Sequence, residues 1–253
     1  REDCAAVAQK IAGIGPVSIL VNNAGIVRRN GMTGADADVI KDWQDVIDVN
    51  LNGVFNVTHA FLKPLRETRG RIVNIGSIQS FVHVRTPSSP AYTASKHGVL
   101  GFTRALAAEL GKEGVRVNAI GPGFIATPLN ANARATNPEL VKSFMDHTPL
   151  GRAGTAEDIV GPAIFLASDL SAYVTGSIVM ADGGYRAVYP GPCLPNCRTQ
   201  PNRARLRARA FSASTSRCWR QRNWLASGST RPRNSRKSLA QAAQSKRPTC
   251  LPV

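Results

Sequence analysis

Short β-rich runs alternate with longer helical segments along residues 1–186. The β-rich runs cover 17–21, 71–75, 115–120 and 177–181 and are rich in Val and Ile. Between them apolar residues recur at helical spacing over 42–67, 92–110 and 155–170, and shorter helices are expected at 3–12 and 138–146. This alternation predicts an α/β fold, a doubly wound parallel sheet with helices on both faces.

The composition changes abruptly at residue 187. Residues 187–253 hold 14 Lys and Arg and no Asp or Glu, whereas residues 1–186 hold 18 basic and 16 acidic side chains. The net charge of +16 therefore belongs mostly to the C-terminal part. Its Arg, Ser, Ala and Pro show no apolar periodicity, so we expect a disordered basic tail at 187–253 after a domain at 1–186.

The tail has two interpretations. Its composition is that of an out-of-frame translation of GC-rich DNA, and this interpretation is favoured because no motif repeats within it. The alternative is a segment that binds phosphate backbones through its positive charge. Four of the five cysteines lie in the tail without any histidine, so we expect no metal site. The lone Cys4 of the domain suits a reducing cytoplasm, and no apolar run reaches the roughly 18 residues of a membrane span.

Polar and glycine-rich clusters follow three of the expected strands. They are 22–25, 76–77 and 121–123. In a parallel sheet the carboxyl ends of the strands meet at one edge, where ligands bind. These three loops therefore predict a site at that edge.

Tyr92 and Lys96 are four residues apart in an expected helix and so share one face. A nearby ammonium group favours the phenolate, so we expect Lys96 to lower the Tyr92 pKa and to prepare it for proton transfer near neutral pH. A solvated lysine beside a half-buried tyrosine is the simpler alternative. Ser77 offers a hydroxyl at the same edge. Asn50 lies within an otherwise apolar helix, where its amide needs hydrogen-bonding partners.

Together these residues resemble the short-chain dehydrogenase/reductase family over about residues 5–186. The resemblance rests on six motifs: Asn22-Asn-Ala-Gly25, Asn50, Ser77, Tyr92-x3-Lys96, Pro122-Gly123 with Thr127, and Asp182-Gly-Gly184. It implies a Rossmann-type fold and an oxidoreductase that interconverts an alcohol and a carbonyl with NAD or NADP. The implied partners are a small-molecule substrate and further copies of the chain, since the helices at 42–66 and 92–110 commonly build the family's dimer and tetramer contacts.

The resemblance also implies residue roles. Tyr92 would be the general acid/base, Lys96 would lower its pKa and bind the nicotinamide-ribose hydroxyls, Ser77 would polarise the carbonyl, and Asn50 would hold a water of the proton relay. The implied cofactor-binding residues are Asn22, Ala24, Gly25, Tyr92, Lys96, Pro122, Gly123, Ile125 and Thr127.

The sequence departs from the family pattern at both ends. A complete member begins with a strand, a glycine-rich phosphate-binding turn, a helix and a second strand, and none of these precedes Asn22. We therefore expect residues 1–186 to be a truncated domain that binds dinucleotide weakly and is not stable alone. A non-catalytic fragment of the family and a nucleic-acid-binding protein acting through the tail are the alternatives.

Two features indicate the substrate class. The interval of 15 residues between Ser77 and Tyr92 resembles that of members acting on polyols and sugars. Arg28, in the run Val27-Arg28-Arg29, resembles members acting on sugar acids and could pair with a carboxylate, although a solvated surface charge is the simpler reading. Residues 128–150 are expected to form a lid over the substrate.

Overall fold

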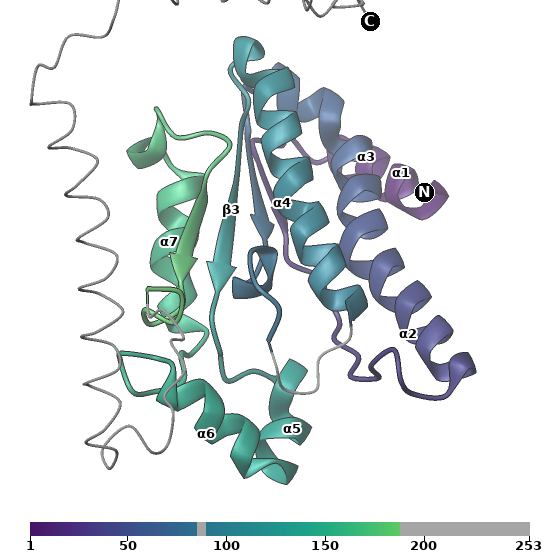
Figure 1. Cartoon of the computed structure of the whole chain (residues 1–253). Coiled ribbons are helices and arrows are strands. Elements are labelled where there is room, and N and C mark those ends of the chain that lie inside the picture. Colours follow the sequence, from purple (N-terminus) through teal and green to yellow (C-terminus); the bar gives the residue numbers. More distant parts are fainter. Residues whose placement is uncertain (85–89, 188–253) are drawn as a thin grey trace, which may run out of the picture. The chain divides into compact units, whose positions relative to one another are not determined.

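The computed structural model describes residues 1–84 and 90–187. The predicted tail therefore lies outside the described residues, apart from Ala187. Four strands form a parallel sheet in the order β1-β2-β3-β4 (Figure 1). They are β1 (Ile19–Asn22), β2 (Arg71–Ile75), β3 (Arg116–Pro122) and β4 (Ile178–Ala181). The four predicted strands are thus confirmed, with shifts of up to two residues at their ends.

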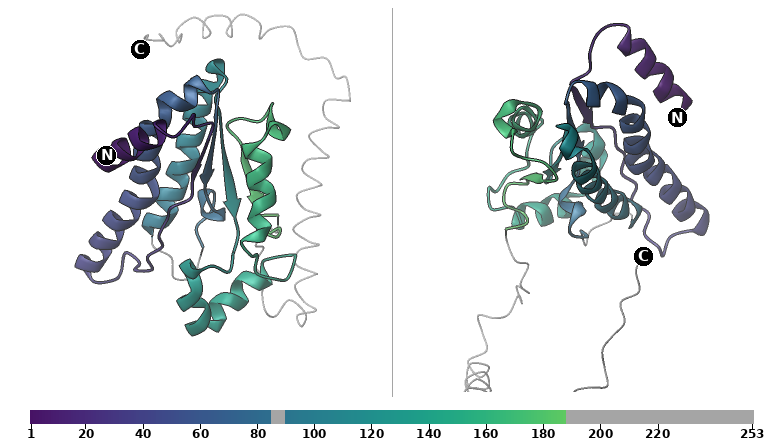
Figure 2. Two further views of the ribbon diagram at one scale, coloured as in Figure 1. Left: turned by 180° about the vertical axis from the view of Figure 1, so that it is seen from behind. Right: turned by 90° about the horizontal axis from the view of Figure 1, so that it is seen from above.

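Helices cover both faces of this sheet, as predicted (Figure 2). The helices of the described part are α1 (Glu2–Ala12), α2 (Asp36–Ile47), α3 (Gly53–Glu67), α4 (Pro90–Leu110), α5 (Ala131–Thr136), α6 (Pro138–Asp146) and α7 (Glu157–Ala167). Helices α3 and α4 pack on one face and α7 packs on the other.

Neighbouring residues of β2 explain how one strand serves both faces. Ile72 packs against Leu65 and Leu110 from α3 and α4, whereas Val73 packs with Leu166 of α7. Successive side chains of a strand point to opposite faces. This short apolar strand therefore contributes side chains to two hydrophobic cores, one on each face of the sheet.

The single helix predicted over 42–67 is divided in the structure. Helix α2 begins earlier, at Asp36, and a π-helical turn over Asp48–Asn52 separates it from α3. Asn50 lies in the middle of this turn and is fully buried. Such turns widen a helix locally and occur frequently at functional sites.

The helix predicted over 155–170 is shorter than expected. Helix α7 begins after Ala156, without a side-chain cap from Thr155. The Asp158 carboxylate instead accepts a hydrogen bond from the Thr155 backbone N–H at 2.8 Å. The helix ends at Ala167, and a 3-10 turn covers Asp169–Ser171.

A polar ladder crosses the buried interior near the carboxyl end of the sheet. Asn22 Nδ2 donates to Thr58 Oγ1 at 2.9 Å and to Asn74 Oδ1 at 2.8 Å. Asn74 Nδ2 donates to Thr103 Oγ1 at 2.9 Å. Because buried polar groups lose stability when they are unpaired, this ladder fixes β1 and β2 against α3 and α4.

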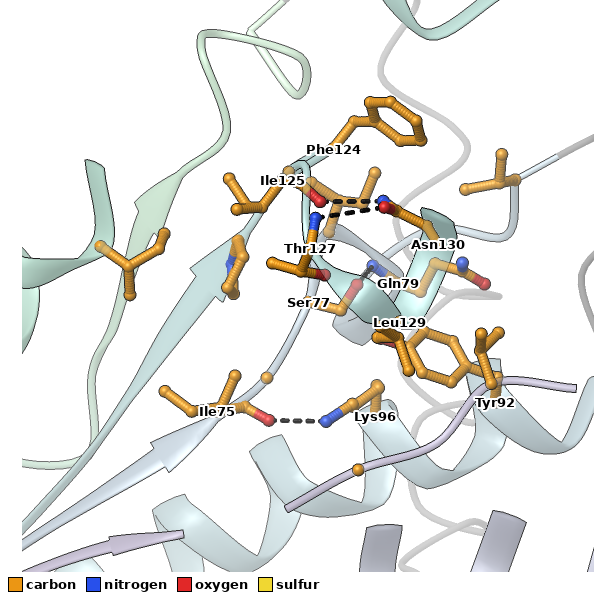
Figure 3. Close-up of a pocket in the computed structure, with 18 of the residues that line it drawn as sticks. Ile75, Ser77, Gln79, Tyr92, Lys96, Phe124, Ile125, Thr127, Leu129 and Asn130 are labelled. Atoms are coloured by element: carbon orange, nitrogen blue, oxygen red, sulfur yellow. Dashed lines mark hydrogen bonds between the residues drawn. The ribbon is translucent and has the colours of Figure 1, made fainter. Parts of the chain in front are cut away.

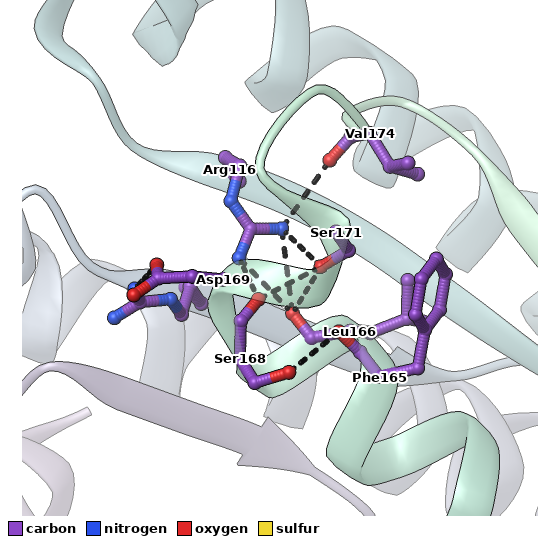
Figure 4. A network of polar contacts seen from close by, with 8 residues as sticks. Arg116, Phe165, Leu166, Ser168, Asp169, Ser171 and Val174 are labelled. Carbon is purple, nitrogen blue, oxygen red and sulfur yellow. Dashed lines mark hydrogen bonds and ion pairs between the residues drawn. The ribbon is translucent and has the colours of Figure 1, made fainter.

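A second network ties the end of α7 to the sheet (Figure 4). The Arg116 guanidinium donates to Ser171 Oγ at 2.7 Å and to the Ser168 carbonyl at 2.9 Å. Arg71 forms an ion pair with Asp169 beside it. Burial, followed by the Arg71 charge, lowers the pKa of Arg116. The network holds the end of α7 that lies away from the candidate site.

Within the described ranges, no helix is long and apolar enough to cross a membrane. The same ranges hold no group of three or more His, Cys, Asp or Glu residues that could bind a metal ion.

Candidate active site

A cavity of about 520 Å³ opens where β1, β2 and β3 end (Figure 3). The loops after these strands, the first turns of α4, and residues of α6 and α7 line it. Eight of the predicted site residues are among the lining residues: Gly25, Ser77, Tyr92, Lys96, Pro122, Gly123, Ile125 and Thr127. The structure thus brings these eight together, but three others, Asn22, Ala24 and Asn50, do not line the cavity.

The chain after β1 runs so that alternate residues face the cavity. Asn23, Gly25, Val27 and Arg29 line it, whereas Asn22 turns into the polar ladder and is 7% exposed. Alternation of this kind is the geometry of an extended chain. Asn23 therefore takes the place at the cavity that the sequence analysis gave to Asn22.

Ser77 is held by the turn that it starts. Its Oγ accepts a hydrogen bond from the Gln79 backbone N–H at 3.1 Å, and the Ser80 hydroxyl accepts one from the Ser77 N–H at 3.2 Å. A hydroxyl has one proton to donate. Because the Gln79 N–H occupies an acceptor position of Oγ, the Ser77 proton points to a second partner, and in this structure that partner is Tyr92.

Tyr92 behaves differently from the prediction. Burial raises the pKa of Tyr92, and a hydrogen bond with Ser77 and the charge of Arg29 only partly oppose this increase. The prediction that Lys96 lowers this pKa was wrong for the chain alone. Lys96 Nζ lies 5.7 Å from the centre of the Tyr92 ring and donates to the Ile75 carbonyl oxygen at 2.7 Å.

Lys96 is itself strongly perturbed. Its side chain is buried, and the loss of hydration lowers its pKa to about 8. The cavity therefore holds a tyrosine that keeps its proton at neutral pH beside a lysine whose charge is lost in mildly alkaline solution.

Asn50 finds the partners that its burial requires. Its Oδ1 accepts from the Ile26 N–H at 2.8 Å, and its Nδ2 donates to the Ile26 carbonyl at 2.9 Å and to Ser95 Oγ at 3.3 Å. A Cβ on Gly25 would lie 3.4 Å from Asn50 Oδ1 and 3.7 Å from Lys96 Nζ. Asn50 therefore holds the extended segment in place, and Gly25 leaves the approach to Lys96 open.

The two arginines after this segment face different ways. Arg28 lies 3.5 Å from Asp45 and 3.9 Å from Asp42, on the side of α2. Arg29 lines the cavity, and its charge acts on Tyr92. The possible carboxylate role of Arg28 is therefore not supported, because its guanidinium faces two carboxylates of this chain.

Aromatic side chains connect α6 to the cavity wall. Phe124 and Phe144 stack with ring centres 4.5 Å apart, and both line the cavity. The ring centre of Tyr185 lies 5.7 Å from that of Phe144. Helix α6 thus borders the cavity within the segment predicted to be a lid. That it opens and closes stays a prediction.

Several lining residues were missed by the sequence analysis. Arg29 could have been found from the two-residue period that starts at Gly25. Gln79, Asn130 and Phe144 also line the cavity, and their positions depend on turns and on packing that periodicity does not reveal.

The donors present fit the nicotinamide-ribose end of a dinucleotide. A buried ammonium group at Lys96 suits ribose hydroxyls, and the Ile75, Pro122 and Ile125 side chains offer an apolar surface to a nicotinamide ring. Gly123 allows a close approach of backbones there, because a Cβ on it would lie 2.7 Å from the Asp182 backbone.

Comparisons with known proteins agree with this geometry. The model of the family described as "Enoyl-(Acyl carrier protein) reductase" matches residues 1–186. Galactitol 2-dehydrogenase (L-tagatose-forming) of Cereibacter sphaeroides is 42% identical over 185 residues, which cover 73% of this chain and 71% of that protein. The 2-dehydro-3-deoxy-D-gluconate 5-dehydrogenase of Dickeya dadantii is 43% identical over 188 residues, covering 72% and 71%.

A solved structure shows the same fold. The gluconate 5-dehydrogenase of Burkholderia cenocepacia J2315, in complex with NADP and tartrate, superposes with a TM-score of 0.68 at 34% identity. The match covers 74% of this chain and 71% of that one.

Proposed function

This chain belongs to the short-chain dehydrogenase/reductase family, and from that premise we propose that it interconverts a secondary alcohol and a carbonyl at the cavity of Ser77, Tyr92 and Lys96. The observation that carries the proposal is the meeting of these three side chains in one cavity at the carboxyl ends of the strands. A bound nicotinamide cofactor would supply the hydride for reduction in its reduced form, NADH or NADPH, and would accept the hydride in oxidation as NAD or NADP.

Tyr92 exchanges the proton with the substrate oxygen. In reduction its hydroxyl donates the proton to the oxygen that becomes the alcohol, and in oxidation it takes that proton back. The raised pKa of Tyr92 keeps the proton on the phenol at neutral pH. The chain alone is therefore prepared for reduction, and oxidation is expected to become faster as the pH rises.

Ser77 orients the substrate oxygen. Its Oγ already accepts from the Gln79 N–H, so its own proton can be donated to the carbonyl oxygen of the substrate. Such a donor stabilises the negative charge that develops on this oxygen. Ser77 and Tyr92 together would then hold the oxygen from two sides.

Lys96 holds the cofactor and adjusts the charge of the site. Its ammonium lies against the Ile75 carbonyl with only 5% of the residue exposed, and its remaining protons suit ribose hydroxyls. Asn50 does not line the cavity, and its hydrogen bonds hold the Ile26 backbone and the Ser95 hydroxyl in place. We therefore assign Asn50 to positioning, and its implied water stays a proposal.

We propose a polyol, sugar or sugar acid as the substrate. Arg29, Gln79 and Asn130 give the cavity polar groups beyond the reacting centre, and Arg29 could pair with a carboxylate. The similar proteins that carry substrate names include dehydrogenases of galactitol and of gluconate derivatives.

An acyl substrate is the second candidate. Val27, Val84, Leu129 and Phe144 form apolar parts of the same lining, and the matching family model is described by an acyl-carrier-protein reductase. An apolar wall of this kind suits an alkyl chain better than a row of hydroxyls.

Steady-state kinetics on the full chain separates these candidates. L-tagatose, 5-keto-D-gluconate and acetoacetyl thioester are offered with NADH and with NADPH, and the Tyr92→Phe variant is the control. We expect turnover of a sugar or sugar acid that falls about 100-fold or more in the variant. Turnover of the thioester alone would favour the second candidate, and equal rates in both proteins would contradict the mechanism.

We also propose that the chain associates with further copies of itself. Ile40, Trp43, Val49 and Phe55 expose between 36% and 58% of their surface along α2, the π-helical turn and α3. Large apolar side chains gathered on one stretch of helices favour a protein interface.

A further inference from the structure

Residues 124–127 follow β3 and form one wall of the cavity. Ile125 and Thr127 line the cavity, whereas Ala126 between them does not (Figure 3). In an extended chain successive side chains point to opposite sides, so this is the pattern of a short strand. The apolar surface that suits a nicotinamide ring includes Ile125, and the position of this backbone therefore decides where that surface lies.

One edge of this segment pairs with the backbone of Gly154. The Ala126 N–H donates to the Gly154 carbonyl at 2.8 Å, and the Gly154 N–H donates to the Phe124 carbonyl at 2.9 Å. The two bonds form an isolated parallel bridge between Ile125 and Gly154. The carbonyl of Ile125 and the N–H of Thr127 belong to the other edge of the segment and need partners of their own.

The side-chain amide of Asn130 pairs with this other edge. Asn130 Nδ2 donates to the Ile125 carbonyl at 2.8 Å, and Asn130 Oδ1 accepts from the Thr127 N–H at 3.3 Å (Figure 3). The two bonded groups come from residues two positions apart, as do the two groups that Gly154 bonds on the opposite edge. The amide of Asn130 therefore takes the place of a neighbouring strand, and the segment is held from both edges.

Arg134 holds the Asn130 amide in its orientation. Its Nε, on α5, donates to Asn130 Oδ1 at 3.0 Å. An arginine side chain can only donate hydrogen bonds, so the acceptor end of the amide must face Arg134 and Thr127. The donor end then faces the Ile125 carbonyl. A reversed amide would direct its own N–H groups at two donors.

We propose that Asn130 is a positioning residue for the nicotinamide end of the cofactor, because it holds Ile125 and Thr127 at the cavity. The proposal rests on the proposed function, which takes this cavity to be the site of a nicotinamide cofactor. The ligand class concerned is a nicotinamide joined to a ribose. Without the Asn130 amide, the segment would lose its pairing on one edge, and its two cavity-lining side chains would no longer have a fixed position.

Binding of reduced nicotinamide mononucleotide tests the proposal, because this probe carries the nicotinamide and its ribose without the adenosine half. NMR titration of the full chain gives its dissociation constant. Asn130→Leu keeps a side chain of similar size and removes both bonds, so we expect the dissociation constant to rise about tenfold or more. Arg134→Met should raise it less, and Arg134→Lys, which keeps a donor, should bind like wild type.

Asn132→Leu is the matched control, since Asn132 is exposed on α5, and it should bind the mononucleotide like wild type. Three results would overturn the inference. They are wild-type affinity in Asn130→Leu, an equal loss of affinity in Asn132→Leu, and no binding of the mononucleotide by the wild-type chain.

Hydrogen exchange of two backbone amides tests the geometry without any ligand. The Thr127 N–H bonds to Asn130, whereas the Ala126 N–H bonds to Gly154. In Asn130→Leu we expect the Thr127 amide to exchange about tenfold faster or more, and the Ala126 amide to exchange at its wild-type rate. Equal acceleration of both amides would show a general loosening of the loop, and an unchanged Thr127 amide would show that its bond to Asn130 is not made. Either result would overturn the inference.

Neither measurement depends on turnover, so the inference and the proposed function can fail separately. A chain that binds the mononucleotide through Asn130 but reduces no carbonyl compound refutes the proposed function and supports the inference. A chain that reduces a carbonyl compound, while its Asn130→Leu variant binds the mononucleotide like wild type, refutes the inference and retains the proposed function.

Discussion

The Lys96 ammonium donates a hydrogen bond of 2.7 Å to the carbonyl oxygen of Ile75, the last residue of β2 and two residues before Ser77. The helix that carries Tyr92 is thereby tied to the strand that presents Ser77. The ammonium sits in a buried position, and the pKa of about 8 is the electrostatic consequence of that position.

The buried Lys96 should make stability depend on pH. Its pKa is about 8 in the folded chain and near 10.4 when unfolded. Between these values the unfolded state binds more protons, so the free energy of unfolding rises with pH. We expect wild type to gain about 2 kcal/mol relative to Lys96→Met between pH 7 and about pH 9.5.

Urea unfolding of both proteins across this pH range measures the difference. Lys96→Met retains Tyr92 and all other titrating groups, so their contributions cancel in the comparison. A difference that does not change with pH, or that decreases, would show that Lys96 is not buried as described.

Arg29 should control the pH dependence of oxidation and the preference for sugar acids. Its charge lowers the pKa of Tyr92, so Arg29→Met should move the alkaline rise of the oxidation rate to higher pH. The same variant should reduce kcat/KM for D-gluconate about tenfold or more, and that for galactitol much less.

Arg28→Met is the matched control for Arg29, since Arg28 faces Asp42 and Asp45 outside the cavity. pH–rate profiles of wild type, Arg29→Met and Arg28→Met give both the alkaline rise of the oxidation rate and kcat/KM for D-gluconate and galactitol. If Arg28→Met causes the larger effect on D-gluconate, the assignment of the two arginines is wrong.

The buried ladder should be a main source of stability. Asn74 is fully buried and joins Asn22 to Thr103. Asn74→Ala removes both hydrogen bonds and leaves a small cavity, so we expect a loss of about 2–4 kcal/mol. Asn52→Ala, which removes an exposed hydrogen bond to Asp48, should cost less than about 0.5 kcal/mol. Chemical denaturation measures the free energy of unfolding of both variants. Equal losses of this free energy in Asn74→Ala and Asn52→Ala would contradict the role of the ladder.

The exposed face of α3 should be an interface between copies. Phe55→Glu places a charge where 37% of an aromatic side chain is exposed, and burying that charge would be unfavourable. We expect light scattering to show association of the wild-type chain and a smaller mass for the variant. Lys63→Glu, at a strongly exposed position of the same helix, serves as the control. A monomeric wild type would contradict the proposed association.

The spacing of apolar residues was sufficient to predict the strands and most helices, because these elements bury one face or run through the core. It failed for the helices predicted over 42–67 and 155–170, for local reasons. The π-helical turn depends on hydrogen bonds to Ile26, a residue 24 positions away. The start of α7 depends on the Asp158 carboxylate reaching back to Thr155.

The candidate site was predictable where motifs and strand ends coincide, at Ser77, Tyr92 and Lys96. The electrostatics were not, because the pKa of Tyr92 depends on burial that the four-residue spacing does not reveal. Gln79 was missed for a similar reason. It borders the cavity in a turn that hydrogen bonds to Ser77 and Thr93 hold in place, and no spacing rule connects it to Thr93.

The central claim is that Tyr92 transfers a proton to the substrate in the cavity that it shares with Ser77 and Lys96. Single-turnover reduction of L-tagatose and 5-keto-D-gluconate by the full chain, with NADPH or NADH in excess, tests it most directly. We predict that wild type forms the alcohol. Tyr92→Phe should keep the melting temperature of wild type but form the alcohol at least about 100-fold more slowly. Equal rates in the two proteins, or no product from either, would contradict the account.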